Sequence, residues 1–248
     1  MAIERPYRRN CRPLVSGRYN TDYVTHEKFA RSPAHYVRAF MLLQKDLIEL
    51  FDFIEPAEDN LSCYSYRIHA LLLRACVEVE ANCKAILTEN GYPKKSSDLN
   101  MTDYKMIEPT HHLSSFQIQL PYWSGEGRTR RPFQSWATAK SLPWYEAYNV
   151  SKHSRQVEFQ QATFANLIDA CCGVLAVLSA QFGENDFSPG PGALLWEGPD
   201  DGMETGIGKY FRVKFPDDWP IEERYEFDWE ILKKEPDPFQ NFPYKNAH

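Results

Sequence analysis

One short segment of the chain gathers side chains that can hydrogen-bond and carry charge. Between positions 145 and 155 it holds Tyr145, Tyr148, Asn149, Lys152, His153 and Arg155. On an α-helix Tyr145, Asn149 and His153 lie on one face at four-residue steps, and Tyr148 and Lys152 form the neighbouring row. The spacing therefore predicts that several polar groups converge.

These residue types suit the chemistry of phosphate groups. Histidine can exchange a proton near neutral pH, lysine and arginine can neutralise a phosphoryl oxygen, and tyrosine and asparagine can orient it. Burying such groups without partners costs ~1–3 kcal/mol each. Either they face a cleft that admits water and ligand, or they bond to one another as a network that only fixes how the helix packs.

Helical patterns surround this segment. A capping serine and a proline, Ser32-Pro33, begin the first apolar helical pattern, and Asn90-Gly91 ends the second. Four helices are expected at about 33–54, 63–90, 143–153 and 164–182. This order predicts an all-α fold, a four-helix bundle with a large excursion in its middle.

Periodicity is absent from the stretch 93–140, which we interpret as a long irregular insertion. A helical turn near 101–106 and an alternating piece at 116–120 are the only regular elements expected there. The Gly- and Arg-rich stretch 125–131 predicts an exposed, mobile basic loop. A connection of this length inside a domain usually serves a purpose.

Charge divides the chain into three parts, a basic N-terminal arm at 1–31, a helical domain at 32–183 and an acidic C-terminal extension at 184–248. Residues 1–31 form a basic N-terminal arm with 7 basic and 3 acidic residues, and residues 184–248 hold 15 acidic and 7 basic residues. We interpret the basic arm as a terminus exposed to solvent. The alternative is an arm that binds nucleic acid. The C-terminal extension is rich in Pro and Gly, with a loop expected at 189–202 and a short strand or hairpin at 210–215.

The extension also carries many aromatic residues, so we expect it to pack on the helical body or on a partner. Its acidic character and the basic character of the insertion predict that the two segments meet.

Two motifs of the chain resemble motifs of the HEPN superfamily. The second helix contains Arg-Ala-Cys-Val-Glu-Val-Glu at 74–80, followed by Lys-Ala-Ile-Leu at 84–87, and the third contains Tyr-Asn-Val-Ser-Lys-His at 148–153. The resemblance covers residues 33–183 and implies a helical bundle that commonly dimerises. Many members are metal-independent ribonucleases that act as toxins or in phage defence.

The catalytic motif of that family is an Arg, a polar residue, three further residues and a His. Asn149 and His153 match the polar residue and the His, whereas Tyr148 stands where the Arg is expected. The resemblance implies that His153 takes part in transfer from the 2′-hydroxyl of RNA, while Lys152 or Arg155 would replace the missing charge. Lys152 lacks the two-pronged fit of Arg to phosphate.

The remaining residues point to few other chemistries. The six cysteines are expected to be reduced thiols in a cytoplasmic protein, since no export signal or membrane-spanning stretch is recognised. His69, Cys76 and Cys83 are spaced too widely on one helix for a zinc ion, and His111-His112 are expected to be exposed. We expect no metal, no cofactor and no membrane partner.

The sequence thus predicts a HEPN-like protein, homodimeric or bound to a protein partner, that acts on or binds RNA or a nucleotide. Its catalytic residues would be His153, Asn149 and Tyr148, with Lys152 and Arg155 binding phosphate. The alternative is a catalytically inactive member that serves as a binding or scaffold subunit of a larger assembly.

Overall fold

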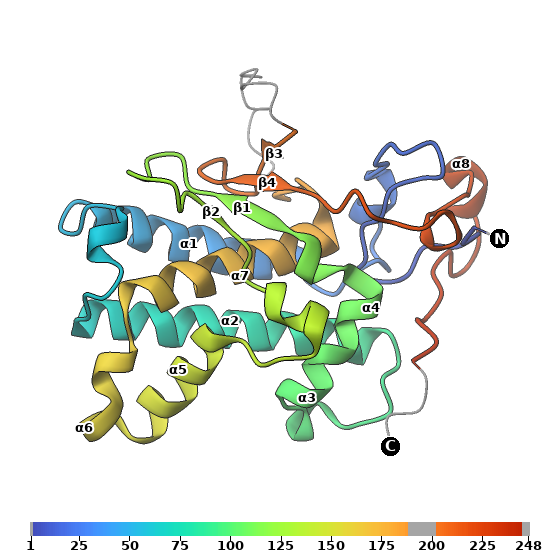
Figure 1. Cartoon of the computed structure of the whole chain (residues 1–248). Coiled ribbons are helices and arrows are strands. Elements are labelled where there is room, and N and C mark those ends of the chain that lie inside the picture. The colour runs from blue at the N-terminus through green and yellow to red at the C-terminus, as the bar shows by residue number, and fades with distance from the viewer. Residues whose placement is uncertain (1, 188–201, 245–248) are drawn as a thin grey trace.

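A computed structural model describes residues 2–187 and 202–244 of the chain. It is rich in helices and carries one small antiparallel sheet (Figure 1). The long helices are α1 (Pro33–Phe51), α2 (Tyr66–Glu89), α5 (Pro143–His153) and α7 (Phe164–Phe182). The short ones are α3 (Met101–Tyr104), α4 (Glu108–His111), α6 (Arg155–Glu158) and α8 (Trp229–Leu232). The predicted all-α class therefore holds only coarsely.

Local signals explain most of the helix ends. The hydroxyl of Ser65 accepts the amide of Ile68 and caps α2, and Gly91 follows that helix with a φ of 76°. Pro143 opens α5, where its missing N–H is not needed. Ser32 does not cap α1 as predicted, because its own backbone is left-handed, with a φ of 49°, and its hydroxyl makes no capping bond.

The helices α2 and α7 pack against each other along their length, and α1 and α5 lie on either side of this pair. Leu167, Cys171 and Leu178 of α7 are completely or almost completely buried, as are Leu72 and Cys76 of α2. All six cysteines are free thiols, in agreement with the sequence prediction.

By length and composition α7 could cross a membrane, which the sequence analysis did not recognise. Of its most apolar window, 83% is buried inside the protein, as in the core helix of a folded domain.

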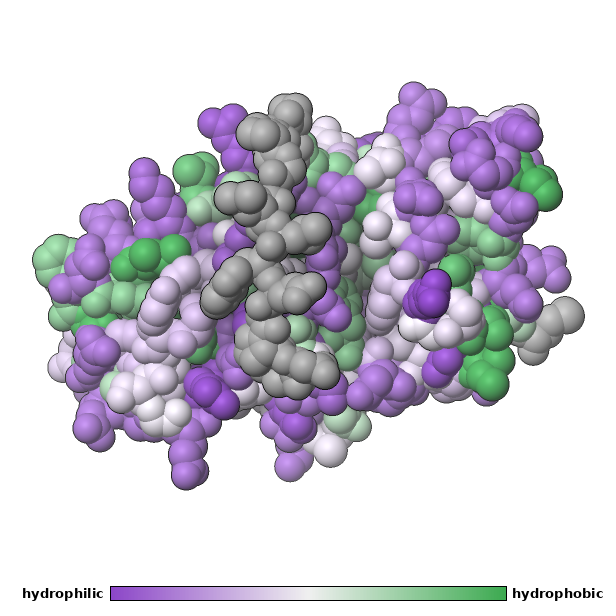
Figure 2. All heavy atoms as spheres, turned by 90° about the horizontal axis from the view of Figure 1, so that it is seen from above, coloured by the Kyte–Doolittle hydropathy of each residue, from purple (hydrophilic) through white to green (hydrophobic). Residues whose placement is uncertain are grey.

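The sheet joins the insertion to the C-terminal extension. Its strands are β1 (Gln117–Gln119), β2 (Thr129–Arg130), β3 (Glu204–Thr205) and β4 (Arg212–Lys214), in the order β2-β1-β4-β3. The sheet lies over α1 and α7, on the side away from α5 (Figure 1). Phe211, next to β4, contacts Phe40 of α1 with ring centroids 6.4 Å apart. From above, the visible surface is mostly hydrophilic, with small, separate apolar patches (Figure 2).

The predicted meeting of insertion and extension is confirmed, although its means differ from the expected attraction of opposite charges. Backbone pairing of Ile118 with Val213 carries most of the contact. His112 of the insertion also faces two carboxylates of the extension, with 3.0 Å separating Nε2 from Oε2 of Glu223 and 3.6 Å separating Nδ1 from Oδ1 of Asp218. The basic loop instead turns towards α7, where Arg130 approaches Asp169. The loop predicted at 189–202 lies outside the described residues, except for its last position.

The prediction of a solvated N-terminal arm is wrong for two of its arginines. Arg9 and Arg12 are 0% and 1% exposed. Arg5 and Arg8 form ion pairs with carboxylates of the extension, on Glu235 and Asp237. The arm and the extension thus pack together, and the opposite charges of these two segments are what pair in this structure.

Candidate functional site

The polar cluster predicted on the third helix lies on α5, where its residues differ in depth. Tyr145 and Tyr148 are buried, Asn149 is half-buried, and Lys152 and His153 are exposed. The cause is the position of α5, which packs against α2 and α7 along its first turns and ends at the surface. The buried part of the cluster therefore packs against the other helices, and the rest of it is exposed to solvent.

Tyr145 belongs to the packed part. Its hydroxyl donates to Oε1 of Glu80 on α2 at 2.8 Å, and its ring lies 5.3 Å from that of Tyr148. Burial raises the pKa of the Tyr145 phenol, and the adjacent Glu80 carboxylate raises it further. Tyr145 therefore stays a neutral hydrogen-bond donor that ties α5 to α2.

Tyr148, at the position of the motif Arg, is paired with Lys152. Nζ of Lys152 donates to the Tyr148 hydroxyl at 2.9 Å and lies 4.9 Å from the centre of its ring. Burial raises the pKa of Tyr148, and the lysine opposes this rise. The hydrogen bond to Tyr148 raises the pKa of Lys152. Lys152 is thus a charged group held at the surface by the buried tyrosine.

The end of α5 leaves three predicted residues without such partners. The side chains of Asn149, His153 and Arg155 form no hydrogen bond or ion pair within the described part of the chain. Ser154 interrupts the helix with φ −126° and ψ 41°, and α6 begins at Arg155. Because the helix is interrupted, the Arg155 side chain does not have the orientation that it would have on a continuous helix. Both His153 and Arg155 are exposed to solvent.

Exposed aromatic side chains adjoin this end, and the sequence analysis did not identify them. Phe159 follows α6, and its ring lies 4.7 Å from Tyr66 and 5.8 Å from Tyr64, at the start of α2. Tyr66 is 72% exposed and Tyr64 is 52% exposed. The sequence signal that could have identified them is the pair Tyr64 and Tyr66, which flank Ser65, the capping residue of α2. We call the group formed by Tyr64, Tyr66, Lys152, His153, Arg155 and Phe159 the α5-end surface.

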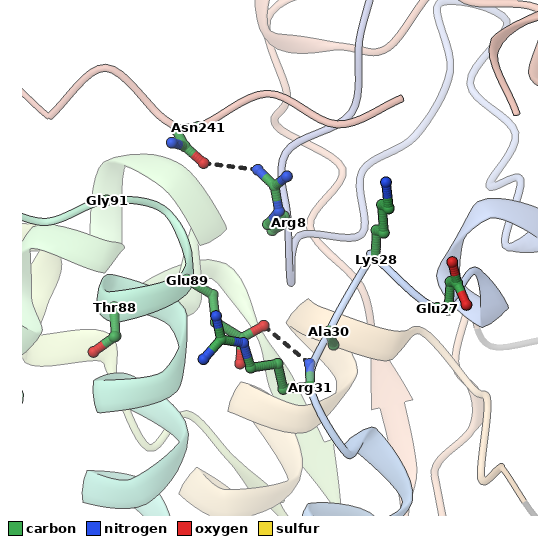
Figure 3. A pocket seen from close by; sticks show the side chains of 9 residues that line it. All are labelled: Arg8, Glu27, Lys28, Ala30, Arg31, Thr88, Glu89, Gly91 and Asn241. Atoms are coloured by element: carbon green, nitrogen blue, oxygen red, sulfur yellow. Dashed lines mark hydrogen bonds between the residues drawn. The ribbon is translucent and has the colours of Figure 1, made fainter. Parts of the chain in front are cut away.

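Two pockets lie elsewhere and share no residue with the α5-end surface. The first, of about 460 Å³, is formed by the N-terminal arm, the end of α2 and the C-terminal segment (Figure 3). Arg8 in this pocket already pairs with Asp237 and Asn241, and Lys28 donates to the carbonyl of Pro236. Its charges thus hold the C-terminal segment in place. The second pocket lies beside β2.

The two histidines of the insertion have different environments. His112 is half-buried, stacked on Trp219 with ring centroids 3.9 Å apart, so it is not the freely exposed residue that was predicted. His111 is buried, and Nε2 donates to the carbonyl of Arg9 at 2.8 Å. In residues 2–187 and 202–244, no three His, Cys, Asp or Glu side chains lie close enough together to hold a metal ion.

No family model, curated protein or solved structure matches this chain.

Proposed function

We propose that this chain is a HEPN-like protein that binds single-stranded RNA at the α5-end surface and cleaves it through His153 without a metal ion. In this proposal α1, α2, α5 and α7 are the four helices of a HEPN-like bundle, and the stretch 93–140 is its insertion. A homodimer and a toxin or phage-defence role in the cytoplasm belong to the same proposal, on the resemblance alone.

The observation that carries the proposal is the position of His153. It is exposed between two cations, Lys152 and Arg155. The exposed rings of Tyr64 and Tyr66 contact Phe159, which follows α6. The start of α2 lies at the same end of the molecule as α6 (Figure 1). Cationic side chains that follow the backbone and aromatic rings that stack on bases are the two elements of single-strand recognition.

The proposed cleavage uses groups of this surface. His153 would take the proton of the 2′-hydroxyl as the 2′-oxygen bonds to phosphorus and the bond to the 5′-oxygen breaks, leaving a cyclic phosphate. The departing oxygen takes a proton from water. Lys152 and Arg155 would stabilise the charge that develops on the phosphate, and Asn149 would orient it.

Cleavage of a single-stranded RNA oligomer by the purified chain, with EDTA present, tests the proposal. We expect the wild type to cleave and His153→Ala to lose at least ~10²-fold in rate, the usual contribution of a general acid or base. His35→Ala is the matched control, because His35 is an exposed histidine on α1. Equal rates for His153→Ala and the wild type would refute the catalytic role.

One observation favours a second function, a catalytically inactive binding or scaffold subunit. The position of the motif Arg is occupied by Tyr148, which is buried and bonded to Lys152, so no guanidinium stands there beside His153. This alternative predicts that the wild type does not cleave RNA but binds it or a protein partner. Loss of RNA binding in the double variant Lys152→Gln/Arg155→Gln, without cleavage by the wild type, would support it.

A further inference from the structure

A second polar site lies between the sheet and α7, in a pocket of about 500 Å³. Six side chains line it: Gln117 of β1, Thr129 and Arg130 of β2, Arg131, Gln134 and Asp169 of α7. They come from the insertion and from the core helix. The pocket is therefore built on the most buried helix of the protein.

Arg130 is the most unusual of these residues, because its guanidinium is buried but incompletely paired. The side chain is only 17% exposed, and its guanidinium carbon lies 5.1 Å from the centre of the Trp123 ring. Nε is 3.7 Å from Oδ1 of Asp169, which is beyond hydrogen-bond distance. Nε and Nη2 are both buried and have no hydrogen-bond acceptor among the described residues.

Charge in the pocket is unbalanced towards positive. Arg131 lines it as a second guanidinium, and its side chain forms no ion pair within the described ranges. Asp169 is the only carboxylate of the lining, so two guanidinium groups face one carboxylate; burial raises the pKa of Asp169, and the nearby Arg130 opposes this rise. The remaining side chains, two amides and a hydroxyl, can donate hydrogen bonds. An anion in the pocket would face the two guanidinium groups of Arg130 and Arg131.

We propose that this pocket binds the phosphate group of a small phosphate monoester, with Arg130 and Arg131 as its principal contacts. Guanidinium groups fit phosphate oxygens with two parallel hydrogen bonds, and such charged bonds are about twice as strong as neutral ones. The volume is within the range of small-molecule sites, roughly 300–1,000 Å³, so the pocket has room for more than an inorganic ion. Trp123 would keep the Arg130 guanidinium in a fixed plane beneath the ligand.

The test measures the thermal stability of the full chain with millimolar inorganic phosphate or AMP, each compared with sodium chloride at equal ionic strength. We expect both phosphates to raise the melting temperature, and AMP to bind more tightly. Arg131→Gln should weaken binding by at least ~10-fold, since it removes one charged contact. Arg128→Gln is the matched control, because Arg128 is an exposed arginine of the same loop that does not line the pocket.

Three results would overturn the proposal. The first is the absence of a phosphate-dependent shift in the wild type, and the second is an equal loss in Arg128→Gln and Arg131→Gln, which indicates only non-specific attraction. The third is full binding by Arg130→Met. If Arg130→Met fails to fold, the comparison of Arg131→Gln with Arg128→Gln decides alone. RNA cleavage does not enter these measurements, so this proposal and the proposed function can fail separately.

Discussion

Arg12, which is 1% exposed, and Arg130, whose side chain is 17% exposed, each lie over a tryptophan ring, but their hydrogen-bond donors differ in their partners. Nε of Arg12 donates to Oδ1 of Asn10 at 2.6 Å, and its two terminal nitrogens donate to the carbonyls of Glu223 and Thr110 at 2.9 and 2.7 Å. Its guanidinium lies 4.6 Å from the Trp219 ring. Arg130 lies over the Trp123 ring, but its Nε and Nη2 have no hydrogen-bond acceptor among the described residues.

The difference distinguishes a structural arginine from one that is available to a ligand. The two terminal nitrogens of Arg12 have acceptors in segments far along the chain, so this guanidinium holds the N-terminal arm, the insertion and the extension together. A buried donor without a partner costs stability, and proteins retain such groups where they serve another purpose. The same residue type is therefore structural in the arm and a ligand contact in the pocket.

Replacing Arg12 should give the largest effect. Arg12→Met removes three hydrogen bonds of a buried charged group, each worth roughly 1.5–3 kcal/mol, so we expect the free energy of unfolding to fall by about 4–5 kcal/mol. Chemical denaturation measures this, with Arg18→Met, an exposed arginine of the same arm, as the control. Equal effects in the two variants would mean that burial of Arg12 carries no stability.

Acid should loosen the same network through His111. Burial lowers the pKa of His111 from 6.5 to about 3, so the folded protein keeps this ring neutral while the unfolded chain protonates it. Its contribution is complete above pH 6.5 and declines as the pH falls towards 3, by about 1.4 kcal/mol per pH unit, or about 3 kcal/mol after two units.

Unfolding free energies of the wild type and of His111→Gln, measured across this pH range, check the sign. The variant should depend less steeply on pH, whereas His35→Gln should follow the wild type. Parallel curves for all three proteins would show that His111 does not titrate differently in the folded state.

Tyr225→Phe should have an intermediate effect. The Tyr225 hydroxyl accepts the amide of Tyr7 at 2.9 Å and lies 3.0 Å from Oδ1 of Asn10, in a buried setting. Its removal leaves that amide unpaired, so we expect a loss of about 2 kcal/mol. Thermal unfolding of this variant and of Tyr122→Phe, whose ring is 74% exposed, provides the comparison. A loss no greater than that of Tyr122→Phe would contradict it.

Arg130→Met should give the smallest change in the absence of phosphate. Nε and Nη2 of Arg130 have no hydrogen bond to lose, and the facing Asp169 is partly exposed, where ion pairs contribute about 0–1 kcal/mol, so we expect a change within about 1 kcal/mol. Denaturation without added phosphate measures it. A loss as large as that of Arg12→Met would erase the distinction between the two arginines.

Local signals in the sequence predicted the helices well. Pro143 and Gly183 mark helix ends through properties of single residues, and the apolar periodicity of α2 and α7 is visible without tertiary context. The buried arm was not predictable in this way. The partners of Arg12 are Thr110 and Glu223, roughly one hundred and two hundred positions away, and no local pattern announces them.

The predicted site was recovered only in part, for the same reason. The helical spacing correctly placed Tyr145, Asn149 and His153 on one helix, but burial changes along α5 because the helix leaves its neighbours towards His153. The helix ends at Ser154, where no Gly or Pro marks a stop. Arg130 looked like part of a solvated basic loop, because its burial depends on Trp123 and α7 rather than on its own neighbours.

The pairing of residue 240 with residue 6 sets an order of events during synthesis. The amide of Gln240 donates to the carbonyl of Pro6 at 3.1 Å, and its side chain donates to the carbonyl of Arg5 at 2.7 Å. Ribosomes make a protein in the direction from N- to C-terminus, so the arm is synthesised before the extension, and these bonds cannot form until residue 240 has emerged. During that interval Arg5, Arg8 and Arg12 lack their partners on the extension.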